Sequence, residues 1–156
     1  MSAMAIHFRY VSRCALAGML MVAPIPVSSA GVFRVTEPWV RVAPSSKSAE
    51  AFMELFSSEG ATLVGVRSDV AAGVTMRPPG TSRSTIDKIP LPAGTTVKLA
   101  AGGYRVALAD LTRSLKLGGR VALVLVIEAA DGSRQEISAD AEVRRRSPSD
   151  DHKHAH

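Results

Sequence analysis

Near the end of the chain, two strand-like segments flank an Asp-Gly dipeptide. Residues 121–127 form a continuous apolar run, and residues 133–143 alternate between apolar and polar side chains. Alternation with a period of two is typical of a β-strand with one buried face. Because Asp131-Gly132 suits the left-handed backbone of a primed turn, the pattern predicts a β-hairpin with a two-residue loop. The side chains expected to face the core are Ile137, Ala139, Ala141 and Val143.

The residues before this hairpin also have the features of an all-β domain. Segments 32–42, 51–56 and 62–66 are rich in apolar residues and are predicted to be strands, with Pro38 marking an edge or a bulge. No sustained 3.6-residue periodicity is present. Turn clusters recur every eight to sixteen residues, at 92–94, 102–103 and 118–119. This spacing predicts a sandwich or a barrel with little helix.

The first thirty residues differ in character from the rest. Arg9 and Arg13 precede an apolar run at 14–27, and small residues lead to Ala30. This order is typical of a signal peptide cleaved after Ala30. A membrane anchor is the alternative, but the run is short and contains two prolines, whereas a spanning helix needs roughly twenty residues. We therefore expect a periplasmic or secreted protein with no stable membrane insertion. Its expected parts are a signal peptide at 1–30, one domain at 31–143 and a disordered tail at 144–156.

Charge and cysteine content exclude several function classes. Without residues 1–30 the chain keeps seventeen of its 19 Lys and Arg residues and all 14 acids, so its formal charge falls from +5 to +3. The basic residues are scattered and only five aromatics remain, which argues against a nucleic-acid partner. The single cysteine, Cys14, lies in the predicted signal peptide, so the domain has no disulfide, thiol chemistry or cysteine metal site.

Enzymatic activity is not expected either. No histidine lies between residues 31 and 143, so a serine nucleophile would have no imidazole base. Nothing in the spacing of Asp69, Asp87 and Asp110 indicates a buried carboxylate pair, and no glycine-rich phosphate loop opens a helix. The sequence therefore predicts a binding protein.

Five short segments occur in this order: 37–41 (EPWVR), 51–55 (AFMEL), 89–94 (IPLPAG), 102–106 (GGYRV) and 115–118 (LKLG). Together they resemble the periplasmic copper chaperones of the PCuAC family. The resemblance covers nearly the whole predicted domain and implies a cupredoxin-like, immunoglobulin-like β-sandwich, with Trp39 and Phe52 in the core and the glycine pairs in turns. Met53 is also expected in the core, because its neighbours Phe52, Leu55 and Phe56 are apolar.

The resemblance also implies where a copper site would lie. Members of the family hold Cu(I) with two histidines and two methionines, which are soft ligands that suit this ion. Aligned by segments, Met76 takes the position of the first histidine and Arg83 that of a lone methionine. A His-x-Met pair falls on Arg105 and Ala107. If this alignment is correct, the side chains of Met76, Arg83 and Arg105 converge. Two guanidiniums about 4 Å apart would repel by roughly 4 kcal/mol at an effective dielectric of 20, so the site is not expected to bind copper tightly.

The C-terminal tail contains the one cluster of metal ligands. His152, His154 and His156 alternate, and Asp150 and Asp151 precede them. Imidazole and carboxylate ligands suit Cu(II), Zn(II) or Ni(II), and the Irving–Williams order favours copper. The sequence thus predicts a copper-binding, chaperone-like protein that uses His152, His154, His156 and Met76 and passes copper to a membrane or periplasmic acceptor protein. The alternative is a metal-free module in which Arg83 and Arg105 contact an anion or an anionic partner.

Overall fold

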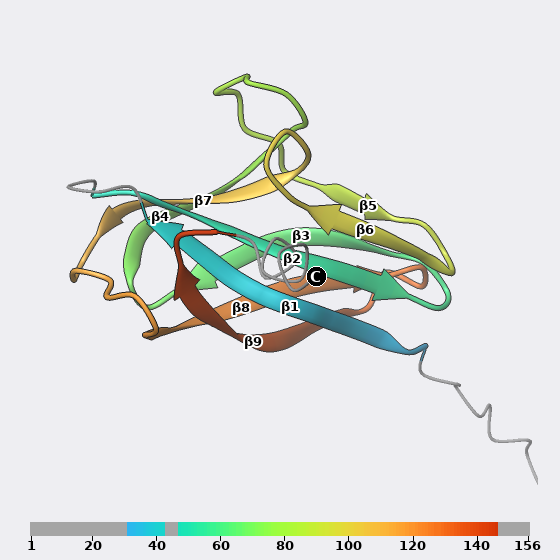
Figure 1. Cartoon of the computed structure of the whole chain (residues 1–156). Helices are drawn as coiled ribbons and strands as arrows, with labels where there is room; N and C mark the ends of the chain where they lie inside the picture. The colour runs from blue at the N-terminus through green and yellow to red at the C-terminus, as the bar shows by residue number, and fades with distance from the viewer. Residues whose placement is uncertain (1–30, 43–46, 147–156) are drawn as a thin grey trace, which may run out of the picture.

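The computed structural model describes residues 31–42 and 47–146, which form a twisted, all-β molecule (Figure 1). Within these two ranges no helix with the length and hydropathy of a membrane span is present. The predicted signal peptide and the tail histidines lie outside the described residues. The strands are β1 (Phe33–Val42), β2 (Ala49–Ser57), β3 (Ala61–Ser68), β4 (Ala71–Arg77), β5 (Ile89–Leu91), β6 (Thr95–Leu99), β7 (Arg105–Leu111), β8 (Arg120–Ala129) and β9 (Arg134–Arg144).

The strands form a single curled sheet in the order β4-β7-β2-β1-β9-β8-β3-β5, and β6 pairs with β2 beyond the end of β7. All pairings along this path are antiparallel except that of β1 with β9, which is parallel. The two halves of the sheet fold over each other, so that one continuous apolar core lies between them. The predicted all-β, sandwich-like fold is confirmed.

The core is built from the alternating positions of both halves. Ala139, Ala141 and Val143 of β9 are buried and Ile137 is half-buried, as the alternation predicts. Met53 is buried in the same core, also as predicted. The fully buried large side chains come from both halves of the sheet and include Leu55, Leu63, Leu108, Leu123, Leu125 and Ile127.

Trp39 and Phe52 are buried on the opposite face of the sheet. They are paired across β1 and β2, as are their neighbours Val40 and Ala51, which point into the central core. Because side chains alternate along a strand, Trp39 and Phe52 project to the other side, here called the outer face. The predicted burial is confirmed, because only 9% of Trp39 and 1% of Phe52 are exposed. The two rings pack against each other, with their centroids 4.7 Å apart.

The loop of the β8–β9 hairpin differs from the prediction. It has three residues, because the Gly132 amide donates to the Ala129 carbonyl at 2.9 Å and Gly132 follows that turn with a φ of 82°. This is the geometry of a type I turn closed by a left-handed glycine, so the expected two-residue primed turn is wrong. The Asp131 carboxylate contributes by accepting from the Ser133 amide at 2.9 Å and from its hydroxyl at 2.6 Å.

The first strand contains the bulge that Pro38 indicated. The register of β1 against β2 shifts by one residue between Thr36 and Trp39, and Glu37 has a φ of 47°. A bulge inserts one unpaired residue and re-aims the side chains that follow it. Trp39 and Arg41 consequently share the outer face. At the other end of the domain, β9 includes Arg144, so the strand extends one residue into the predicted tail.

Candidate functional site

The side chains of Met76, Arg83 and Arg105 were expected to converge, but they do not. Met76 of β4 is opposite Val106 of β7, and both are buried in the central core. Arg105 is opposite Arg77, and because alternate residues face opposite sides, these two arginines lie on the outer face. The alignment that gave Met76 the position of the family's first histidine is therefore wrong. Arg77 is the residue of β4 that shares a face with Arg105.

Arg105 ties the loop after β4 to β7. Its Nη1 donates to the Gly80 carbonyl at 2.6 Å and its Nη2 to the Ser82 carbonyl at 3.2 Å, while only 9% of the residue is exposed. Its Nε lies 3.4 Å from Oε1 of Glu50 on β2. A buried guanidinium is tolerated when it is paired and hydrogen-bonded, and Arg105 meets both conditions. Arg83 is exposed in the loop that Arg105 holds.

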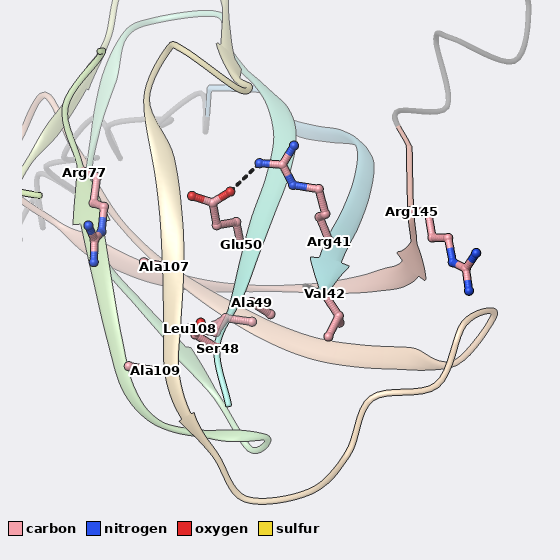
Figure 2. Close-up of a pocket in the computed structure, with 10 residues that line it drawn as sticks. All are labelled: Arg41, Val42, Ser48, Ala49, Glu50, Arg77, Ala107, Leu108, Ala109 and Arg145. Atoms are coloured by element: carbon pink, nitrogen blue, oxygen red, sulfur yellow. Dashed lines mark hydrogen bonds and ion pairs between the residues drawn. The ribbon is translucent and has the colours of Figure 1, made fainter. Parts of the chain in front are cut away.

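Glu50 also pairs with Arg41 of β1, which is its direct neighbour in the β1–β2 register. The Arg41 Nη2 lies 2.5 Å from the Glu50 Oε2, as the dashed line in Figure 2 indicates. The Arg41 guanidinium carbon lies 5.0 Å from the centre of the Phe52 ring, within the range of a cation–π contact. One carboxylate thus pairs with two arginines, and one of these, Arg41, lies over the Phe52 ring.

Next to this network lies a pocket of about 750 Å³. Figure 2 shows Glu50 between Arg41 and Arg77, with Arg145 at the rim after β9. The Nε of Arg77 is buried and has no hydrogen-bond partner. The remaining lining residues are Val42, Ser48, Ala49, Ala107, Leu108 and Ala109.

A second, smaller pocket of about 420 Å³ shares Arg41 and Arg145 with the first and contains Trp39 in its wall. Lys98 of β6 lies there, with its Nζ 2.7 Å from the Glu54 Oε1. This hydrogen-bonded pairing with Glu54 raises the pKa of Lys98 above its ordinary value. Lys98 and Glu54 therefore compensate each other in this pocket.

The outer face is a poor match to copper. Over 31–42 and 47–146, no three His, Cys, Asp or Glu side chains are placed to share a metal ion. At the positions that the resemblance assigns to a His-x-Met pair, the guanidinium of Arg105 has no lone pair to donate and the methyl group of Ala107 offers none. The histidines that the sequence singles out, His152, His154 and His156, lie outside the described residues.

Sequence reasoning missed Arg41, Glu50, Arg77 and Arg145. Strand alternation around Met76 was the available signal for Arg77, because a strand that buries Met76 must turn Arg77 outward. No comparable signal exists for the contact of Arg41 with Glu50, which depends on the register of β1 against β2.

Residues 33–141 match the family model described as "Putative lipoprotein LpqE-like". Three solved structures resemble the fold. The copper-bound PCuAC domain from PmoF2 is 26% identical, with a TM-score of 0.62 over 73% of this chain and 93% of that one. The apo PCuAC domain from PmoF1 is 25% identical, with a TM-score of 0.64 over 73% and 94%. The Cu(I) form of DR1885 from Deinococcus radiodurans is 27% identical, with a TM-score of 0.56 over 73% and 77%. No curated protein matches the chain.

Proposed function

The chain belongs to the LpqE-like family and is of the PCuAC type, and we propose that it is a copper-binding, chaperone-like protein without enzymatic activity. Two of the structures it resembles are named as copper-bound or Cu(I) forms. The protein would act outside the cytoplasm after cleavage behind Ala30 and would pass copper to an acceptor protein in the periplasm or the membrane.

We place the copper on the C-terminal histidines and not on the folded domain. This placement depends on the contacts that Arg105 already makes within the fold. Its guanidinium occupies the outer face beside Ala107 and is bonded to two loop carbonyls and to Glu50. A permanently charged group at this position repels a cation and offers it no electron pair. Met76 faces the core, so it is not available to complete a site on the outer face.

The tail has the ligand chemistry that the domain lacks. His152, His154 and His156 provide three imidazoles, and Asp150 and Asp151 add carboxylate oxygens. Nitrogen and oxygen ligands of this kind favour Cu(II) over Cu(I). Fixing three histidines of a chain segment around one ion costs conformational entropy, so the affinity is expected to be modest.

Titration with Cu(II), and with Cu(I) under a competing chelator, tests this proposal. We would compare residues 31–156 with a version that ends at Ser147 and with a full-length triple variant in which His152, His154 and His156 are changed to Asn. We expect Cu(II) binding by the first protein only. Tight Cu(I) or Cu(II) binding that survives both the truncation and the triple substitution would refute the tail site. Binding by none of the three proteins would refute copper binding itself.

A further inference from the structure

The loop between β7 and β8 presents an apolar side chain at its tip. A turn in this loop is closed by a hydrogen bond from the Gly119 amide to the Lys116 carbonyl at 2.9 Å, and Gly118 has a φ of 79°. This is the backbone of a type II turn, with Leu117 at the first central position. Leu115 packs against the core and anchors the loop, whereas 54% of Leu117 is exposed. Leu117 therefore projects into solvent from a well-defined turn.

This turn lies among exposed basic residues. The Gly118 amide donates to the Val143 carbonyl and the Val143 amide to the Gly119 carbonyl, both at 2.9 Å, so the turn is held beside the end of β9. The Leu111 amide donates to the Lys47 carbonyl at 2.9 Å, which holds the start of the same loop beside β2. In Figure 1 these segments share one end of the molecule, where β1 and β9 end and β2 and β8 begin. Four exposed cations at this end, here called the basic end, are Lys47, Arg113, Lys116 and Arg145.

The charge of the basic end is not balanced within the described part of the chain. None of its four cations forms an ion pair with another described residue. Figure 2 shows the Arg145 side chain directed away from the larger pocket. Arg120 and Arg144 are nearby but are paired with acids. Asp69 and Asp110 are exposed close to the loop, so four unpaired cations stand against two acids, and the potential around Leu117 is positive.

A leucine that protrudes among cations favours an anionic lipid surface as the partner. Each Lys or Arg close to such a surface strengthens binding by about fivefold. An aliphatic side chain can enter the boundary between headgroups and acyl chains while long basic side chains beside it stay at the level of the headgroups. A protein partner usually buries roughly 1,000 Å² or more of fitted surface, which a single leucine on a convex turn does not offer. No aromatic residue lies in 111–120, so stacking with nucleic-acid bases is not provided there.

We propose that the basic end docks reversibly on an anionic phospholipid bilayer, with Leu117 inserted among the headgroups and the four cations facing lipid phosphates. Only one apolar side chain enters the bilayer, so this is peripheral binding without stable insertion. The proposal does not depend on copper, because the residues of the basic end belong to the folded domain and its partner is an anion.

Cosedimentation with vesicles tests the proposal. Residues 31–156, without copper, are mixed with phosphatidylcholine vesicles that contain about 30% phosphatidylglycerol. We expect binding that falls strongly between about 50 mM and about 500 mM salt, and no binding to vesicles of phosphatidylcholine alone. Lys116→Gln should weaken binding by about fivefold and Leu117→Ser by about tenfold.

Two matched controls should leave vesicle binding unchanged. Lys88→Gln removes an exposed lysine from the loop before β5. Val32→Ser removes an apolar side chain that is 54% exposed, as Leu117 is, but that precedes β1 at the opposite end of the molecule. Because all four substituted residues are exposed, the variants are expected to fold.

An environment-sensitive dye reports on Leu117 directly. Residues 31–156 contain no cysteine, so Leu117→Cys and Val32→Cys each accept a single label. With anionic vesicles the emission of the label at position 117 should shift to shorter wavelength and that of the label at position 32 should not. Identical responses of the two labels would contradict the insertion of the turn.

Four further outcomes would overturn the proposal. These are the absence of binding to anionic vesicles, equal binding to neutral vesicles, equal effects of the variants and their controls, and binding to soluble polyglutamate that is as tight as binding to vesicles. The version that ends at Ser147 should bind vesicles as well as residues 31–156 do. A loss of binding in that version would assign the interaction to the tail and refute the basic end.

Discussion

Arg105 and Glu50 form an ion pair on the outer face, with the arginine Nε 3.4 Å from the glutamate Oε1, and the same guanidinium holds the loop that contains Gly80 and Ser82. Residues on β7, on β2 and in the loop after β4 are thereby joined through one side chain. Arg105 therefore holds this loop against the sheet through contacts within the chain.

Replacing Arg105 tests the importance of this link. Arg105→Ala should lower the free energy of unfolding by about 2–3 kcal/mol, because it removes charge-assisted hydrogen bonds from a mostly buried group and leaves two loop carbonyls without a donor. Urea unfolding of the two proteins measures the difference. Arg120→Ala is the control, since the Arg120 side chain is 61% exposed and its nearest carboxylate oxygen, on Asp140, is as far as 3.8 Å away. This substitution should change the free energy of unfolding by less than about 0.5 kcal/mol. Equal effects of both substitutions would contradict the assignment.

A substitution of Phe52 tests the aromatic pair, because Phe52 packs against Trp39 outside the central core. Only 1% of the residue is exposed, and its ring contacts both Trp39 and Arg41. Phe52→Ala should reduce stability by about 3–5 kcal/mol, as for other buried aromatic deletions. Trp39 is the single tryptophan of the chain, so its fluorescence should shift to longer wavelength as water reaches the indole. An unchanged emission spectrum in a folded variant would show that the pair is not packed as described.

Substitutions of Met76 test whether its side chain is part of the core or a copper ligand. Met76→Leu keeps the volume of the side chain and should cost less than about 1.5 kcal/mol, whereas Met76→Asn places an amide in the apolar core and should destabilise the protein strongly. Copper affinity of the folded Met76→Leu variant should equal that of the unchanged protein, because the Met76 side chain faces inward. A loss of copper binding in the folded leucine variant would restore Met76 as a ligand.

Asp131 makes the hairpin loop sensitive to acid. Hydrogen bonds from the Ser133 hydroxyl and then from the Ser133 amide lower the pKa of Asp131 below its ordinary 3.8. A carboxyl group with a lowered folded pKa stabilises the protein above its unfolded pKa and loses that contribution as the pH falls through the folded value. The difference in Tm between the unchanged protein and Asp131→Ala should therefore be constant from pH 7 to about pH 5 and should shrink below pH 3.8.

Ser133→Ala serves as the control for this measurement. It removes the hydroxyl bond at 2.6 Å but keeps the amide bond at 2.9 Å. Its loss of stability at pH 7 should be smaller than that of Asp131→Ala, and its acid dependence weaker than that of the unchanged protein. A Tm difference between the unchanged protein and Asp131→Ala that grows as the pH falls would contradict the sign of the shift.

Local patterns were sufficient for the strands and for one side of the core. The alternation in 133–143 correctly placed Ala139, Ala141 and Val143 inward, and Pro38 correctly indicated the bulge. Both signals depend on residues within a few positions of one another. The hairpin loop shows the limit of such signals, because Asp131-Gly132 fits both a two-residue and a three-residue turn, and the hydrogen bonds of Ser133 select the longer one.

The candidate site depended on contacts between distant segments. The parallel pairing of β1 with β9 brings Arg145 to the rim of the pocket, and the registers of β2 with β1 and β7 place Glu50 between Arg41 and Arg105. The amino-acid sequence alone determined the all-β class, the strand periodicity and the absence of histidine from the domain. Only the tertiary structure decided which charges meet, because a shift of one residue in register moves every side chain of a strand to the opposite face.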